Sequence, residues 1–147
     1  MSDIYELLSK DHKKAKELID KIQSTPDGSE KVRQKLFSEL KQELEIHTTF
    51  EEKVFYPDAK HKTGMEDVIR DAMEEHDEAK QLLEALAEME PTSAEWMETV
   101  KELSEVLGHH IKDEEQELFP ASRKTLDPAQ ADKMGKEYVE MKRKELS

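Results

Sequence analysis

The sequence contains no cysteine, so disulfide bonds and thiolate metal ligands are excluded. No apolar run approaches the roughly 20 residues that a membrane span needs. Basic residues are too few to balance the acidic ones, since 23 Lys and Arg stand against 36 Asp and Glu, a net charge of −13. This charge repels nucleic acid and anionic membranes, so we expect neither as a partner. Met1 leads directly into a polar segment without a signal peptide, and we therefore expect a cytoplasmic protein.

The composition favours long amphipathic helices, because 40% of the residues are charged and only 4 are glycine. A length of 147 residues suits one domain, covering 1–147. Apolar residues recur with helical spacing in four segments, which run over about 3–23, 30–57, 65–86 and 94–120. The predicted fold is all-α: an antiparallel up-down-up-down four-helix bundle over about 3–121. A short fifth helix, over about 127–145, is expected to lie against it.

An internal repeat relates the two halves of the predicted bundle. The segment from His47 to Pro57, with the sequence HTTFEEKVFYP, recurs 63 positions later as HIKDEEQELFP, from His110 to Pro120. The pair Asp11-His12 likewise recurs 64 positions later as Glu75-His76. The chain therefore contains two helical hairpins of one pattern, and their pairing predicts a bundle with approximate twofold symmetry.

Four histidines are predicted to meet in one layer of the bundle core. Each lies on the apolar face of a different helix, and they are His12, His47, His76 and His110. Each is nine to eleven residues from a helix boundary at the same end of the bundle. At a rise of ~1.5 Å per residue, all four therefore lie about 14–17 Å from that end. His109 competes with His110, but the repeat register favours His110.

Two glutamates share the apolar faces with these histidines. Glu51 follows His47 by four residues, and Glu114 follows His110 by four, so each pair occupies one face of its helix. Burying two unpaired carboxylates is costly, and Lys80 at the margin is one cation against two anions. Metal ions between the carboxylates would remove this cost. Imidazole and carboxylate donors suit iron, manganese or zinc, and the lack of thiolate ligands disfavours a structural zinc site.

This pattern resembles the hemerythrin-like, or HHE cation-binding, family in its four-histidine form. The similarity covers about residues 3–121 and rests on the ordered set His12, His47-x-x-x-Glu51, His76 and His110-x-x-x-Glu114. The resemblance implies two non-haem iron ions that are bridged by Glu51 and Glu114. An oxo bridge between the two ions is compatible with it. It assigns His12 and His47 to one ion, and His76 and His110 to the other.

One position departs from the oxygen-carrying hemerythrins, which place a further histidine where this chain has Lys80. The resemblance therefore implies sensing or stress-response chemistry with a small diatomic or peroxide ligand, rather than oxygen transport. A peroxidase-like or catalase-like oxidoreductase and an iron buffering or delivery protein are the alternatives. Tyr56 falls nearly opposite His47 on an ideal helix and is predicted to be structural. Candidates for contact with the ligands are Tyr5, Lys80, Glu52 and Glu115.

Overall fold

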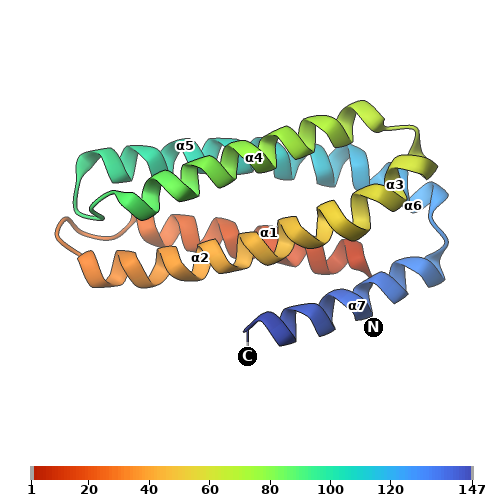
Figure 1. The fold of residues 1–147 in the computed structure, drawn as a ribbon, viewed down its shortest axis with the longest axis horizontal. Coiled ribbons are helices and arrows are strands. Elements are labelled where there is room, and N and C mark those ends of the chain that lie inside the picture. The colour runs from red at the N-terminus through yellow and green to blue at the C-terminus, as the bar shows by residue number, and fades with distance from the viewer. Residues whose placement is uncertain (1, 147) are drawn as a thin grey trace.

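The computed structural model describes residues 2–146, apart from the side chains of residues 61–63. Four long helices, α1 (Ile4–Gln23), α2 (Glu30–Phe50), α4 (Glu66–Glu88) and α5 (Ala94–Asp113), run antiparallel to their chain neighbours as two hairpins (Figure 1). The predicted all-helical bundle is confirmed. The shorter helices α3 (Tyr56–Thr63) and α6 (Phe119–Thr125) lie together at one end of it. In the described part of the chain, no helix is long and apolar enough to cross a membrane.

Side-chain caps mark the starts of two long helices. Asp3 accepts a hydrogen bond from the Glu6 amide at 3.0 Å, and Ser93 accepts one from the Trp96 amide at 3.1 Å. Each cap satisfies an amide that has no partner within its helix. These caps fix where α1 and α5 begin.

The expectation that two helices stop near Pro57 and Pro120 is wrong. Each continues through a π-helical turn, η1 (Glu51–Phe55) or η2 (Glu114–Leu118), into α3 or α6. The extra residue in such a wide turn displaces the backbone carbonyl that a proline ring would otherwise strike. The break expected over residues 58–64 shrinks to its end, where Gly64 caps α3 with a positive φ of 70°.

Two apolar clusters fill the bundle on either side of the layer that contains His12. The first cluster lies toward α3 and α6 and includes Leu8 and Phe55. The second lies toward the loops that join α1 to α2 and α4 to α5, and it includes Ala15 and Leu103. Leu8, His12 and Ala15 follow one another on the inner face of α1, so a polar layer interrupts an otherwise continuous core. The histidine layer is therefore enclosed by protein above and below.

Helix α7 (Pro128–Leu146) forms the expected C-terminal addition and lies along α1 and α2 (Figure 1). Ala131, Met134 and Tyr138 are buried on its inner face. Gly135 brings its backbone against the start of α1, because a Cβ atom there would lie 2.8 Å from the Ser2 carbonyl oxygen. Contact between backbones, rather than side chains alone, joins α7 to the bundle.

Replacing Gly135 by alanine is expected to lower the free energy of unfolding by about 1–3 kcal/mol, because the new methyl group overpacks this contact. Gly108→Ala is the matched control, since a Cβ at this helical position meets nothing within 4 Å. That control should stabilise the protein by about 0.5–1 kcal/mol. Urea unfolding measures both. Equal effects of the two substitutions would contradict the close approach of α7 to α1.

Candidate metal centre

Four imidazoles from four helices converge in the bundle core. His12, His47, His76 and His110 are all buried, and they come from α1, α2, α4 and α5 respectively. They group in pairs: the ring centroids of His12 and His47 are 4.9 Å apart, and those of His76 and His110 are 4.6 Å apart. The structure thus brings together all four histidines that the sequence singles out, and each hairpin contributes one pair.

Two fully enclosed carboxylates lie between these pairs. Glu51 is 0% and Glu114 is 1% exposed. Oε1 of Glu51 is 3.1 Å from Nε2 of His47, in its own hairpin, and 3.1 Å from Nε2 of His76, in the other. Oε1 of Glu114 repeats this arrangement, at 3.4 Å from Nε2 of His110 and 3.0 Å from Nε2 of His12. Each glutamate therefore reaches from one histidine pair to the other.

The glutamates that follow Glu51 and Glu114 hold histidines of the opposite hairpin from outside. Oε2 of Glu115 is 2.7 Å from Nδ1 of His12, and Oε2 of Glu52 is 2.8 Å from Nδ1 of His76. Both were candidates for such contacts on the sequence, and the structure places both against the histidine layer. Each links the two hairpins of the bundle.

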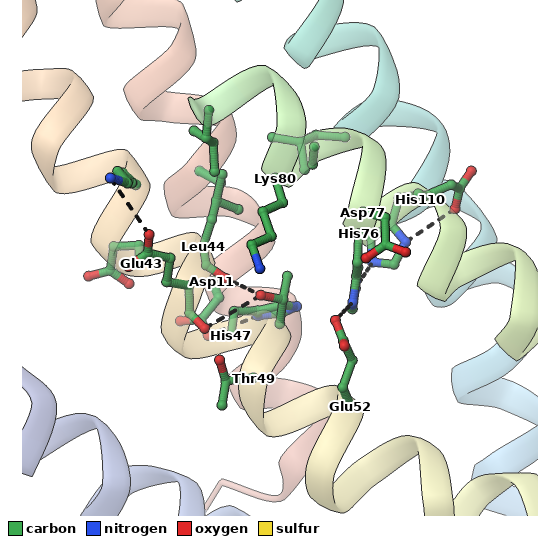
Figure 2. Close-up of a pocket in the computed structure, with 18 of the residues that line it drawn as sticks. Asp11, Glu43, Leu44, His47, Thr49, Glu52, His76, Asp77, Lys80 and His110 are labelled. Atoms are coloured by element: carbon green, nitrogen blue, oxygen red, sulfur yellow. Dashed lines mark hydrogen bonds and ion pairs between the residues drawn. The ribbon is translucent and has the colours of Figure 1, made fainter. Parts of the chain in front are cut away.

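Two further carboxylates, which the sequence analysis did not single out, complete the outer ring. Oδ2 of Asp11 is 3.1 Å from Nδ1 of His47, and Oε1 of Glu75 is 3.2 Å from Nδ1 of His110 (Figure 2). The available signal was the repeat itself, because an acidic residue directly precedes both His12 and His76. With Nδ1 held by a carboxylate on all four rings, Nε2 is the nitrogen left to face the centre.

Tyr56 also belongs to the site, and the prediction that it is only structural is wrong. Its hydroxyl donates to Glu114 and to Oε1 of Glu51 at 3.2 Å, and lies 3.2 Å from Nε2 of His76. The π-helical turn explains the error, because it places Tyr56 one wide turn after Glu51 on the same face. Its counterpart in the repeat is Phe119, which stacks on His12 with centroids 6.0 Å apart.

The other candidates from the sequence lie away from the centre. Tyr5 is buried, but its hydroxyl lies 2.7 Å from Oγ of Ser122, so its role in the core is packing and that single bond. Lys80 is exposed and lines the cavity beside the histidines (Figure 2). His109 is on the surface next to Glu75, whereas His110 faces the core. Lys80 therefore lies one helical turn after His76 at the edge of the histidine layer, and its side chain is exposed.

A cavity of about 500 Å³ reaches the histidine layer from the side. Its wall includes His47 and Thr49 on α2, and His76 and Lys80 on α4 (Figure 2). The rings of His47 and His76 therefore border this cavity, which residues of the second apolar cluster, such as Ala15 and Leu83, also line. This volume lies within the range of ordinary small-molecule pockets.

Several buried polar atoms at the centre are suited to binding a metal ion. Among the described residues, four buried atoms that face the centre make no hydrogen bond of acceptable geometry: Nε2 of His12, Nε2 of His47, Oε2 of Glu51 and Oε1 of Glu114. Within that part of the chain, the nitrogens of His12 and His47 have only the ion-pair contacts with Glu114 and Glu51 given above. Leaving such groups unpaired costs free energy, whereas coordination to a cation satisfies them. Potential ligand atoms of His12, Glu51, His110 and Glu114 all lie within 4.8 Å of one another. This close set of nitrogen and oxygen donors is suited to a metal.

Without a cation, the histidines must carry the compensating charge. Burial opposes protonation of His47, but the carboxylates of Glu51 and Asp11 outweigh it and raise the pKa of His47 to about 10. Burial and the neighbouring glutamates act in the same opposed way on His110, whose pKa is well above its usual range. Burial likewise resists ionisation of Glu51, yet His47 keeps its pKa well below normal. A bound metal would replace these protons.

The fold and this centre define the chain as a metal-binding four-helix bundle with imidazole and carboxylate ligands. The family model of the hemerythrin HHE cation binding domain matches residues 3–122, so the chain belongs to that family. The match ends before α7.

Two known proteins illustrate the relationship. The crystal structure of a hemerythrin HHE cation binding domain-containing protein from Mycobacterium kansasii superposes with a TM-score of 0.84. The two are 27% identical, and the similarity covers 99% of this chain and 88% of that one. A protein of Nostoc sp. named "DNA nickase" is 29% identical over 142 residues. That match covers 97% of this chain but only 40% of the Nostoc protein.

Metal-free protein is expected to lose stability as the pH rises from about 6.5 to about 10. The folded pKa of His47, about 10, exceeds its ordinary value of 6.5, so protonation stabilises the fold fully only below the lower value. Chemical unfolding of chelator-treated protein across this range measures the trend. His47→Gln should flatten it. Constant or rising stability in the unsubstituted protein would contradict the assignment of protons to the histidine layer.

Proposed function

We propose that the chain holds two non-haem iron ions and that this di-iron centre binds or reacts with dioxygen, peroxide or nitric oxide. One observation carries the proposal: Glu51 and Glu114 are both buried, and each contacts imidazoles of both histidine pairs. A carboxylate with two oxygens, placed between two sets of nitrogen donors, suits a bridge between two ions. Iron would supply the redox chemistry, with manganese and zinc as the weaker alternatives.

The proposed roles follow the two hairpins. His12 and His47 would hold one ion and His76 and His110 the other, an assignment supported by their ring distances of 4.9 and 4.6 Å. The outer carboxylates keep each ring oriented with Nε2 inward and strengthen its basicity. The four histidines and the two shared glutamates would give each ion fewer than the five or six donors that iron prefers. Coordination positions would therefore stay open for a small ligand. The cavity between α2 and α4 gives that ligand access.

Tyr56 favours a reaction with peroxide as a second candidate function. Burial, together with the charges of Glu114 and Glu51, holds the pKa of Tyr56 well above its usual range, so the phenol keeps its proton. Its hydroxyl contacts both bridging glutamates and is therefore a proton donor at the place where a ligand would bind. A simple iron buffer has no use for such a group. This supports a peroxidase-like or catalase-like oxidoreductase as the enzymatic form of the proposal.

The activity named for the Nostoc protein is not extended to this chain. This chain spans 40% of that protein, so the nicking activity can belong to the rest of it. A net charge of −13 also disfavours approach to DNA. We propose that the partner is a small oxygen-derived ligand and that neither nucleic acid nor a membrane is bound.

Metal analysis and visible spectroscopy of the purified protein test the proposal. We expect two iron ions per chain and a visible absorption that disappears on reduction and changes with dioxygen, peroxide or nitric oxide. Glu51→Ala and Glu114→Ala should each abolish the paired centre, because each removes a bridge. Glu39→Ala, an exposed position on α2, is the control and should retain both ions. A colourless protein without iron after growth in iron-rich medium would contradict the proposal.

Tyr56→Phe is expected to retain iron but to slow the decomposition of peroxide by about 100-fold or more, because the buried proton donor is lost. The matched control is Tyr5→Phe, which removes another buried hydroxyl that bonds Ser122 outside the centre. Oxygen evolution from peroxide measures the rate in both. Equal rates in the two variants would exclude Tyr56 from the reaction while leaving iron binding in place.

A further inference from the structure

Helix α7 reaches the metal centre through a buried carboxylate of α1. The Tyr138 hydroxyl and the Lys142 ammonium group both donate hydrogen bonds to Asp11, and Asp11 in turn contacts Nδ1 of His47 at 3.1 Å. Tyr138 is fully enclosed and Asp11 is nearly so. The end of the chain thus acts on a proposed metal ligand through one intermediate residue. The family match at residues 3–122 does not include these α7 residues.

Lys142 also ties α7 to α2. Its ammonium nitrogen is 3.2 Å from Oε2 of Glu43, a buried carboxylate whose other oxygen is 3.1 Å from Nζ of Lys14. The ammonium group therefore joins carboxylates from α1 and α2 at the edge of the histidine layer. Contacts with His47, Lys142 and Tyr138 hold the Asp11 carboxylate in one orientation.

Packing alone does not account for these polar contacts. Ala131, Met134 and the ring of Tyr138 bury the inner face of α7, and that ring lies 4.8 Å from the ring of Phe50. A phenylalanine would fill the same space. The hydroxyl of Tyr138 adds a bond to Asp11, and Lys142 places a charge there. Both additions act on the carboxylate behind His47.

The other half of the centre is held differently. Glu75 occupies the place of Asp11 in the repeat and contacts Nδ1 of His110. Its additional partner is His109, an exposed residue of the same helix as His110. In the described part of the chain, neither a tyrosine hydroxyl nor a lysine is recorded in a bond to Glu75. Helix α7 lies against α1 and α2 and supports only the half that contains Asp11.

We propose that α7 makes the two metal positions unequal: Tyr138 and Lys142 act through Asp11 to orient His47, so the ion at His12 and His47 binds more tightly than its neighbour. This inference rests on the proposed two-ion site and adds a role for the C-terminal helix. Tyr138 and Lys142 are positioning residues. Partners at this distance from a metal typically change its affinity about 10- to 100-fold, which makes the difference measurable.

Anaerobic titration of metal-free protein with Fe²⁺, in competition with a chromophoric chelator, tests the inference. The unsubstituted protein should show two affinities, and with one equivalent of ⁵⁷Fe²⁺ its Mössbauer spectrum should be dominated by one doublet. Tyr138→Phe and Lys142→Gln should each weaken the tighter position about 10- to 100-fold, leave the other unchanged, and spread one equivalent over two doublets. Tyr5→Phe and Arg143→Gln are the matched controls and should resemble the unsubstituted protein.

Asp11→Asn decides whether the effect passes through Asp11. In that background, Tyr138→Phe should have little further effect on the tighter position, because the two residues act in one chain of contacts. A full effect of Tyr138→Phe in the Asp11→Asn protein would overturn the inference. So would equal weakening of both positions, or unaltered affinities in the single variants. If thermal unfolding shows that Tyr138→Phe does not fold, Lys142→Gln provides the same test.

The outcomes separate this inference from the proposed function. If the unsubstituted protein binds fewer than two ions, the di-iron proposal fails. If it binds two ions and the α7 variants match the Tyr5→Phe and Arg143→Gln controls, only the role of α7 fails.

Discussion

The rest of the structure depends on two carboxylates that are buried in the core. Glu51 and Glu114 are enclosed between apolar clusters, where an uncompensated negative charge is far more costly than on the surface. Protons on the histidines or cations between the carboxylates must compensate for it. The four imidazoles, the outer carboxylates and the phenol of Tyr56 surround these two groups. Protonated histidines or bound metal ions thus allow the layer to be a stable part of the core.

The backbone is adapted to the same requirement. Both π-helical turns begin at one of the two buried glutamates, and each is followed by an aromatic residue and a proline. The wide turn brings Tyr56 round to the centre and turns Phe119 onto His12. Helices then continue past both prolines as α3 and α6, whose packing closes that end of the bundle. The geometry of the site and the closure of the core therefore arise from one local distortion.

The sequence predicted those features of the fold and the site that depend on regular helical periodicity. The four inward histidines, the two glutamates one turn later and the antiparallel bundle follow from residue spacing and the repeat. The predicted orientation of Tyr56 and the predicted helix ends are wrong because each π-helical turn contains more residues than an α-helical turn. Side chains after Glu51 and Glu114 therefore point in other directions than a regular helix would give. Asp11 lies on the edge of its helix face, where spacing alone does not separate a buried carboxylate from a solvated one. Its partners come from α7, more than a hundred residues later.

The repeat makes the differences between the two halves informative. Tyr56 stands where the second half has Phe119. Asp11 is held by α7 beside His47, whereas Glu75 contacts His110 and the surface residue His109. A duplicated scaffold would by itself give two equivalent metal positions. The phenol lies beside His76, in one half, whereas the α7 contacts support His47, in the other. Helix α7 therefore supports the ligand set of one half, and in the other half a phenol proton donor lies beside the histidine. In the proposed di-iron centre, such a division would let one ion anchor the centre while the other reacts.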